Sequence, residues 1–346
     1  MSVAPPPLVE PPPTRPPVLS NPAETLDQLP ARISQILTAI QDVIVGQDGA
    51  IKAVFYALFS HGHCLLVGMP GLGKTLLVKA LARLLGLPFS RIQFTPDLMP
   101  SDITGTEILQ EDHATGQRQF VFVPGPVFTN VLLADEINRT PPKTQAALLE
   151  AMQEKTVTVA GNMYALNEPF IVLATQNPIE QEGTYPLPEA QLDRFLFEIR
   201  MDYPTLENEQ RVVVQHSFTP TENLTALLTQ DEILQYRAAI ARIPSAPNVV
   251  DYAVRLVRAT RPTESSAPDY IKRWIRWGAS PRASQYLIIA ARARAACKGR
   301  FNVACEDVAA LAPMVLRHRM IRSFQADAEG KSTDDIISQL LKDVLE

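Results

Sequence analysis

Apolar residues recur in two alternating patterns over the first two thirds of the chain. Segments with the three-to-four-residue spacing of a helix lie at 31–40, 47–60, 74–85 and 142–154. Segments of strand length lie at 64–67, 89–94, 131–134, 170–174 and 196–201, of which 64–67, 131–134 and 170–174 are continuous apolar runs and the other two contain polar residues. Buried strands that alternate with helices form parallel sheets covered on both faces, so the pattern predicts an α/β fold, an αβα sandwich with a parallel sheet.

Two segments interrupt this alternation and predict inserted β-hairpins. Residues 103–128 hold two strand-like runs around the turn-rich stretch 112–116, between the second and third strands of the predicted sheet. Residues 155–168 repeat the arrangement around Ala160-Gly161-Asn162. Both hairpins would therefore lie outside the core sheet.

The pattern divides the chain into four parts. Residues 1–22 hold three runs of proline, which cannot form a hydrogen-bonded core, so we expect a disordered leader. After Met201 the strand pattern stops and helical spacing continues, which predicts an all-α lid domain. The expected divisions are a Pro-rich leader at 1–22, an αβα core at 23–201, a helical lid at 202–325 and a C-terminal amphipathic helix or tail at 326–346.

Composition narrows the classes of function. The formal net charge of −5 leaves no general basic surface for nucleic acid or an anionic membrane. No apolar run is long enough to span a bilayer, and no signal peptide is apparent, so we expect a cytoplasmic protein. Three cysteines, an odd number, favour a reducing compartment. His61 and His63 lack further ligands nearby and are interpreted as polar loop residues rather than a zinc site.

One octamer matches the phosphate-binding loop pattern G-x-x-x-x-G-K-[ST] at every position. It lies between a strand-like run and a helical one, as that motif requires. Lys74 would contact the β- and γ-phosphates of ATP, and the Thr75 hydroxyl would be a ligand of Mg²⁺. The predicted nucleotide-binding residues are Gly68, Met69, Pro70, Gly71, Leu72, Gly73, Lys74, Thr75 and, at the start of the helix, Leu76.

Polar residues follow the predicted core strands at 131–134 and 170–174. Asp135 and Glu136 end the run 131–134, where the first carboxylate can hold Mg²⁺ and the second can act as general base on a water. Asn177 follows the run 170–174, and in a parallel sheet it would reach the same edge as Asp135. The sequence also allows a simpler interpretation, in which Asn177 caps the turn before Pro178.

Several further strings make the chain resemble the AAA+ ATPases, and within them the MoxR family. The strings are Asp135-Glu136-Ile137-Asn138-Arg139, Ala174-Thr175-Gln176-Asn177-Pro178, Leu187–Phe195 and Gly278-Ala279-Ser280-Pro281-Arg282, and the resemblance covers about residues 30–322. It implies that Asp135 and Glu136 form the Walker B pair and that Asn177 is sensor 1. It also implies that Arg194 is an arginine finger for a neighbouring subunit and Arg282 is sensor 2. Val45-Gly46-Gln47 would lie near adenine.

The resemblance implies an ATP- and Mg²⁺-dependent ATPase that forms a homo-oligomeric ring, expected to be a hexamer. It would act like a chaperone on a protein client, often with a von Willebrand factor A-domain partner. The alternatives are a magnesium-chelatase-like motor subunit, a nucleic-acid motor and a nucleotide-dependent assembly switch. A nucleic-acid motor calls for basic residues on a hairpin, and the tip at 160–162 has none. Glu136 argues against a switch without hydrolysis.

Overall fold

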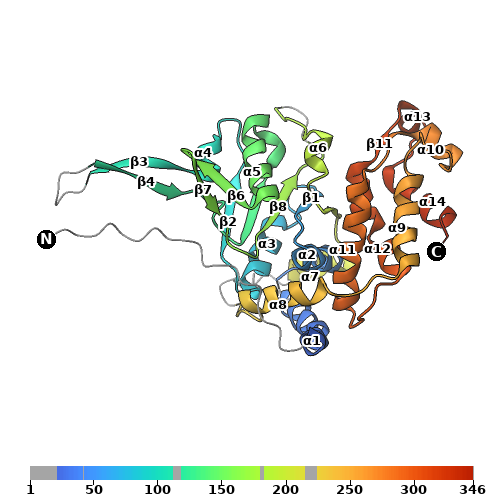
Figure 1. The fold of residues 1–346 in the computed structure, drawn as a ribbon, viewed down its shortest axis with the longest axis horizontal. Helices are drawn as coiled ribbons and strands as arrows, with labels where there is room; N and C mark the ends of the chain where they lie inside the picture. The colour runs from blue at the N-terminus through green and yellow to red at the C-terminus, as the bar shows by residue number, and fades with distance from the viewer. Residues whose placement is uncertain (1–21, 42, 112–117, 180–182, 215–223, 346) are drawn as a thin grey trace.

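The computed structural model describes residues 22–41, 43–111, 118–179, 183–214 and 224–345. The predicted disordered leader, except its last residue, and the turn of the first hairpin lie outside the described residues. Figure 1 shows a sheet flanked by helices, a helical lid on one side of it and a long hairpin that projects on the other. The predicted sandwich, hairpins and lid are therefore all present.

The central sheet has five parallel strands in the order β2-β5-β8-β1-β9. Their bounds are β1 Cys64–Gly68, β2 Phe89–Gln93, β5 Val131–Asp135, β8 Ile171–Gln176 and β9 Phe197–Met201. Since all five strands run in one direction, the segments that follow them open on one edge of the sheet, here called the carboxyl edge. The segments that precede them lie on the opposite, amino edge.

Alternate strand residues pack into two separate hydrophobic clusters, one on each face of the sheet. Leu66 and Leu133 belong to the larger cluster, whereas their neighbours Leu65 and Leu132 belong to the smaller one. The larger cluster includes α1 (Pro22–Gln41), α2 (Asp48–Phe59) and α3 (Lys74–Leu84), and it continues into the lid. The smaller cluster includes α5 (Pro142–Glu154). The predicted αβα sandwich is thus confirmed.

Two antiparallel hairpins extend from the core. The first follows α4 (Pro100–Thr104) and pairs β3 (Gly105–Glu111) with β4 (Arg118–Pro124), and the second pairs β6 (Thr156–Val159) with β7 (Asn162–Ala165). The Phe122 ring stacks on the Tyr164 ring with centroids 4.0 Å apart, and Asn162 Nδ2 donates to Glu107 Oε1 at 3.4 Å. The two insertions therefore pack together into one structure (Figure 1).

The lid is helical, but it also contains a strand pair that the sequence analysis missed. The strands β10 (Ile275–Trp277) and β11 (Ile321–Arg322) pair antiparallel. They are too short to show a period of two, and they pair across more than forty residues, so no local pattern reveals them. The other lid elements are α8 Gln230–Ile240, α9 Pro247–Ala259, α10 Asp269–Trp274, α11 Pro281–Cys297, α12 Cys305–Leu316, α13 Phe324–Ala328 and α14 Thr333–Asp343.

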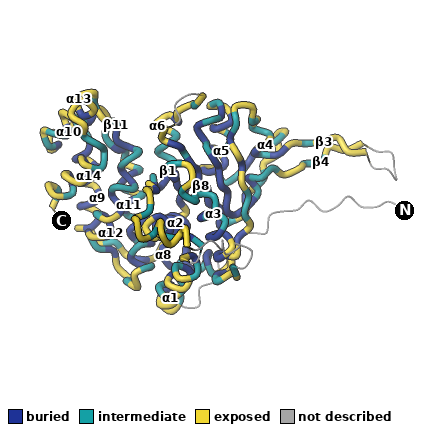
Figure 2. Tube along the Cα trace, turned by 180° about the vertical axis from the view of Figure 1, so that it is seen from behind, coloured by how far each residue is buried: buried dark blue, intermediate teal, exposed yellow. Residues whose placement is uncertain are grey.

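The C-terminal segment folds onto the lid rather than standing apart from it. Ile336, Ile337 and Leu340 of α14 are buried beside α9 and α12, and Figure 2 shows the buried lid helices as one packed unit. Side chains spaced at three and four residues form the buried face of this helix, as its amphipathic pattern predicts. Within the described ranges, no helix is both long and apolar enough to cross a bilayer.

Candidate active site

The phosphate-binding loop joins β1 to α3 and takes a backbone conformation that favours glycine. Gly71 and Gly73 have φ of +85° and +75°, and α3 begins at the next residue, Lys74. Left-handed residues in such a loop let successive backbone N–H groups line a concave surface, and the first turn of α3 adds its partial positive charge. The loop therefore has the geometry of an anion site.

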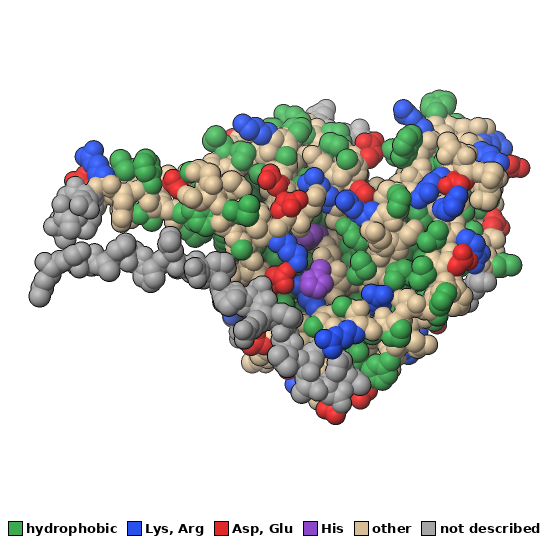
Figure 3. All heavy atoms as spheres, viewed as in Figure 1, with side chains coloured by type: hydrophobic (Ala, Val, Ile, Leu, Met, Phe, Trp, Pro, Cys, Tyr) green, Lys and Arg blue, Asp and Glu red, His purple; other side chains and the backbone are tan. Residues whose placement is uncertain are grey.

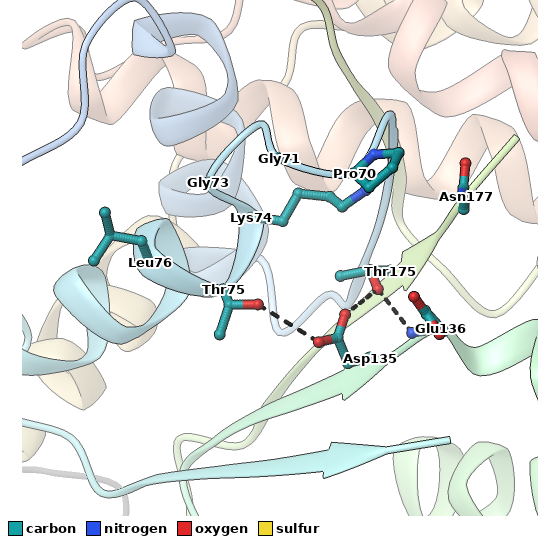
Figure 4. Close-up of a pocket in the computed structure, with 10 residues that line it drawn as sticks. All are labelled: Pro70, Gly71, Gly73, Lys74, Thr75, Leu76, Asp135, Glu136, Thr175 and Asn177. Carbon is teal, nitrogen blue, oxygen red and sulfur yellow. Dashed lines mark hydrogen bonds between the residues drawn. The ribbon is translucent and has the colours of Figure 1, made fainter. Parts of the chain in front are cut away.

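A cavity of about 440 Å³ lies beside this loop at the carboxyl edge. Figure 4 shows side chains from the loop, from the end of β5 and from the end of β8 turned toward it. Its lining residues are Pro70, Gly71, Gly73, Lys74, Thr75, Leu76, Asp135, Glu136, Thr175 and Asn177. The structure thus brings six of the nine predicted loop residues, the two carboxylates and Asn177 around one space, whereas Gly68, Met69 and Leu72 do not line it.

Asp135 is nearly buried, and its carboxylate is held by three side chains. Thr175 Oγ1 donates to Oδ1 at 2.6 Å, and Arg91 Nη2 donates to Oδ2 at 2.6 Å. Thr75 Oγ1 lies 3.5 Å from the same Oδ2 (Figure 4). A carboxylate beside a hydroxyl at the mouth of a phosphate cradle is a donor set that fits Mg²⁺, which is usually held by one or two carboxylates with substrate phosphates.

Glu136 has an uncommon backbone conformation, with φ of +56°, just before the 3-10 turn Ile137–Arg139. A left-handed non-glycine residue costs on the order of 1–3 kcal/mol and tends to occur at functional sites. Its N–H donates to Thr175 Oγ1 at 2.8 Å, which holds the residue at the strand end. Its carboxylate accepts hydrogen bonds from Gln93 Nε2 at 3.1 Å and Arg139 Nη1 at 3.3 Å.

Asn177 caps a turn and also lies at the phosphate cavity. Its Oδ1 accepts a hydrogen bond from the N–H of Ile179 at 3.2 Å, so it does cap the turn after β8. The residue also lines the cavity. A side chain fixed in this way can present a polar group to a bound phosphate without rearranging.

The sequence analysis gave no role to three residues of the site. Thr175, within β8, belongs to the string Ala174–Pro178, whereas Arg91 and Gln93 on β2 belong to no motif. All three contact the carboxylates because β2 and β8 flank β5 in the sheet. The sequence offered one indirect signal for Arg91 and Gln93. Because side chains alternate along a strand, these two residues of β2 point to the same face of the sheet.

Arg194 and Arg282 lie away from the phosphate cavity, at the amino edge. With His61, Lys155 and Tyr286 they line a second cavity of about 190 Å³. Residue 196 anchors this segment, because its N–H donates to the carbonyl of His63 just before β1. At about 3.3 Å per residue, the five-residue strand β1 separates the two edges by roughly 15 Å. Neither arginine therefore lines the phosphate cavity of its own chain.

The surroundings of this second cavity are basic. Figure 3 shows histidine and basic side chains gathered in the hollow between the core and the lid. Burial, together with Arg237 and Lys155, lowers the pKa of His61 to about 4, so its ring is neutral at pH 7. His63 is occupied by the fold, since its Nδ1 accepts from the N–H of Val172 at 2.9 Å and its Nε2 lies 3.1 Å from the carbonyl of Met152.

The Val45-Gly46-Gln47 segment borders a third cavity, of about 490 Å³. Gly46 and Gln47 line it with Ile199, Tyr203 and Met314, and Gln47 Nε2 donates to the carbonyl of Asp202 at 3.2 Å. Val45 is not among its lining residues. Arg200, Asp202, Arg317 and Asp334 also line it, so the pocket combines an apolar and aromatic wall, of the kind that can hold a nucleotide base, with charged groups.

Comparison with known proteins places these features in a family. The profile "ATPase family associated with various cellular activities (AAA)" matches residues 63–197, and the profile "AAA lid domain" matches 270–340. "Chaperone MoxR1" of Mycobacterium tuberculosis is 46% identical over 90% of this chain and 81% of its own length. "Protein MoxR" of Methylorubrum extorquens is 36% identical over 81% of this chain and 85% of its own.

A solved structure from Cytophaga hutchinsonii, described as that of a candidate ATPase, has the same fold. It superposes with a TM-score of 0.84 at 41% identity and covers 93% of this chain and 97% of its own. The lid profile extends to residue 340, beyond the range 30–322 over which the sequence resemblance had been drawn. Helix α14 therefore falls largely within the matched lid.

Proposed function

The chain belongs to the MoxR family of AAA+ ATPases, and from this premise we propose that it forms a ring that hydrolyses ATP to remodel protein clients. The observation that carries this proposal is the separation of two sets of residues. Lys74, Asp135 and Glu136 lie at the carboxyl edge, and Arg194 and Arg282 lie at the amino edge. An active site that needs both sets is completed by two subunits.

Within one subunit, the residues of the phosphate cavity have distinct tasks. The loop binds the phosphates of ATP, and Lys74 places its charge on the β- and γ-phosphates. Thr75 and Asp135 would hold Mg²⁺, which when bound neutralises charge on the phosphate oxygens. Glu136 takes a proton from the attacking water, and Asn177 orients that water. Thr175 fixes both carboxylate residues through its two hydrogen bonds.

The neighbouring subunit supplies the arginines. The structure records no hydrogen bond or ion pair for the Arg194 guanidinium to any described residue. A rigid guanidinium supplied from outside stabilises the charge of the transferring phosphoryl group and can raise the rate by on the order of 10³ or more. Arg282 borders the same cavity, so we assign both arginines to the neighbour's ATP. A hexamer and a von Willebrand factor A-domain partner are part of the proposal.

Mixing two inactive variants tests the shared site. Arg194→Ala and Lys74→Ala chains should each lack turnover, whereas their mixture should regain activity. In the mixture, the intact phosphate loop of an Arg194→Ala chain can meet the intact Arg194 of a Lys74→Ala chain. At a one-to-one ratio, random assembly joins the two intact halves at about a quarter of the interfaces. ATP hydrolysis is measured across mixing ratios, with sedimentation to show that the chains co-assemble.

The Arg255→Ala chain is the matched control. Arg255 is a half-exposed lid arginine that bonds Asp251, away from both cavities, so its variant should hydrolyse ATP like the unaltered protein. Mixtures of Arg194→Ala and Lys74→Ala that stay inactive while co-assembled would show that Arg194 does not act between subunits. Hydrolysis by a monomer at a concentration-independent specific rate would remove the need for a ring.

The joined hairpins supply the surface for a client protein. Their exposed apolar side chains are Ile108, Leu109, Phe120, Val123 and Met163, and the green patches on the projecting hairpin in Figure 3 show where they gather. Exposed apolar groups on a polar surface mark sites of protein contact. Because these side chains stand on strands fixed by the Phe122–Tyr164 stack, a movement of one hairpin also displaces the other.

We predict that this surface binds protein and not nucleic acid. Phe120→Ser and Met163→Ser together should leave basal ATP hydrolysis unchanged and weaken the stimulation of hydrolysis by an unfolded model protein such as casein. Apolar side chains of this size contribute about 1.5–3 kcal/mol when buried, which corresponds to roughly tenfold or more in affinity. Tight, salt-sensitive binding of single-stranded DNA, lost on deletion of 158–164, would instead favour a nucleic-acid motor.

A further inference from the structure

The segment that carries Arg194 is held by the lid. Arg319, which follows α12, is nearly buried, with its side chain only 2% exposed. Its Nε donates to Asp193 Oδ1 at 2.7 Å, and its Nη2 donates to the carbonyls of Asp193 at 3.0 Å and Phe195 at 2.6 Å. Its Nη1 lies 3.3 Å from the carbonyl of Leu196. One guanidinium thus fixes the chain on both sides of Arg194.

Two more lid residues bind the carboxylate next to Arg194. Ser280 Oγ donates to Asp193 Oδ2 at 3.2 Å, and Arg282 Nη1 lies 3.4 Å from the same oxygen. Asp193 therefore joins three lid residues that are 87 to 126 positions away in the sequence. The core holds this segment at Leu196, whose N–H donates to the carbonyl of His63. The lid binds the Asp193 carboxylate and three backbone carbonyls, so it contributes most of the long-range hydrogen bonds that position the segment.

The arrangement is costly if stability alone is its purpose. A buried ion pair commonly contributes no more to folding stability than well-packed apolar residues of the same size, because both charges lose their hydration. Burial lowers the pKa of Arg319, and the Asp193 carboxylate opposes that shift. The N–H groups of the Arg319 guanidinium, however, fix the backbone at three carbonyls within four residues, which a packed apolar side chain would not do.

We propose that Arg319 is a positioning residue for the active site of the neighbouring subunit. From the lid, it fixes residues 193–196 so that Arg194 points outward toward the neighbour's γ-phosphate. A shift of the lid then moves Arg194 and changes the rate of ATP hydrolysis in the neighbouring subunit. This inference rests on the proposed action of Arg194 between subunits.

Mixed rings separate this role from a loss of folding. Arg319→Gln and Asp193→Asn should each lower kcat by about 100-fold, the typical cost of a misplacement of about 1 Å, with little change in the KM for ATP. Adding Lys74→Ala chains should restore turnover to either variant. The Lys74→Ala chains supply a correctly placed Arg194, and the Arg319→Gln or Asp193→Asn chains supply an intact phosphate loop. Adding Arg194→Ala chains should restore nothing, because every finger is then defective.

The Arg294→Gln chain is the matched control. Arg294 is also a mostly buried lid arginine, paired with Asp307 and Glu306, and it does not contact residues 193–196. Its variant should keep nearly full turnover. Arg319→Lys, which keeps the charge but not the fork, should behave like Arg319→Gln. Should either variant prove too unstable to assemble, the other still tests the same contact.

Four results would overturn the inference. Rescue of Arg319→Gln or Asp193→Asn by Arg194→Ala chains, or the absence of rescue by Lys74→Ala chains, would show a defect in the variant's own site. Full kcat in both variants would show that the contact is not needed. Failure of the Arg194→Ala and Lys74→Ala pair itself to complement would refute the intersubunit finger and this inference with it, and that experiment identifies which premise failed.

Discussion

The Lys74→Ala chain is expected to lose nucleotide binding, with ATP affinity reduced by at least ~100-fold. Lys74 is the one lysine of the loop, and its Nζ contacts the carbonyls of Gly68 and Met69 at the base of the cavity. From there it can turn to the phosphates as ATP enters. Hydrogen bonds to charged groups contribute about 1.5–3 kcal/mol each, and a lysine shared by two phosphates makes more than one. Isothermal titration calorimetry measures the loss.

The Lys79→Ala chain is the control for that experiment. Lys79 is on the same helix, one turn further on, and does not line the phosphate cavity. Its variant removes an equal charge and should bind ATP as the unaltered protein does. Unchanged affinity in the Lys74→Ala chain would mean that the loop backbone alone holds the phosphates, and the assignment of this cavity would be wrong.

The Glu136→Gln chain should bind ATP normally and lose turnover. The amide fills the same space and can still accept the hydrogen bond from Arg139, so affinity should stay within about threefold, but it cannot take a proton from water. General-base catalysis contributes about 10²–10⁴-fold, and we expect kcat to fall by that factor. Nucleotide binding by calorimetry and phosphate release are measured on the same preparation.

A comparable change elsewhere gives the reference. Glu150→Gln removes an exposed carboxylate from α5, the helix that follows Glu136, without touching the cavity, and its kcat should not change. If the Glu136→Gln chain hydrolysed ATP within about threefold of the unaltered protein, less than a general base contributes, another group would have to be the base.

The strand pattern predicted the sheet most directly at the central strands β1, β5 and β8, which are buried and begin as continuous apolar runs. The edge strands β2 and β9 contain charged residues and exposed positions, and they were predicted from their place in the alternation with helices. Helix α5 was predicted with its observed bounds, 142–154, since Pro142 occupies the first helical turn, where proline is favoured. The order of strands in the sheet does not follow from such local patterns. The strand order depends on which faces pack together. It places Arg91 and Gln93 of β2 beside the carboxylates of Asp135 and Glu136.

The site was predictable where residues adjoin a motif and not where they meet through the fold. Lys74 ends the loop that follows β1, Asp135 ends β5 and Asn177 follows β8, so the parallel direction alone predicts that they share an edge. Arg319 lies 126 residues from Asp193, in a stretch of three basic or histidine residues that has no distinctive spacing. Nothing in the sequence distinguishes its guanidinium from those of the arginines nearby, such as the exposed Arg322.

Under the proposed action of Arg194 between subunits, the location of the phosphate loop and Arg194 on opposite edges also restricts the symmetry of the active assembly. A two-fold dimer that joins the two amino edges would set finger against finger and leave both loops incomplete. A head-to-tail arrangement joins unlike edges at every interface. An open row of subunits always has one loop without a finger at one end and one finger without a loop at the other. Closure into a circle removes both ends, so the complete ring is the smallest assembly in which every copy is equivalent.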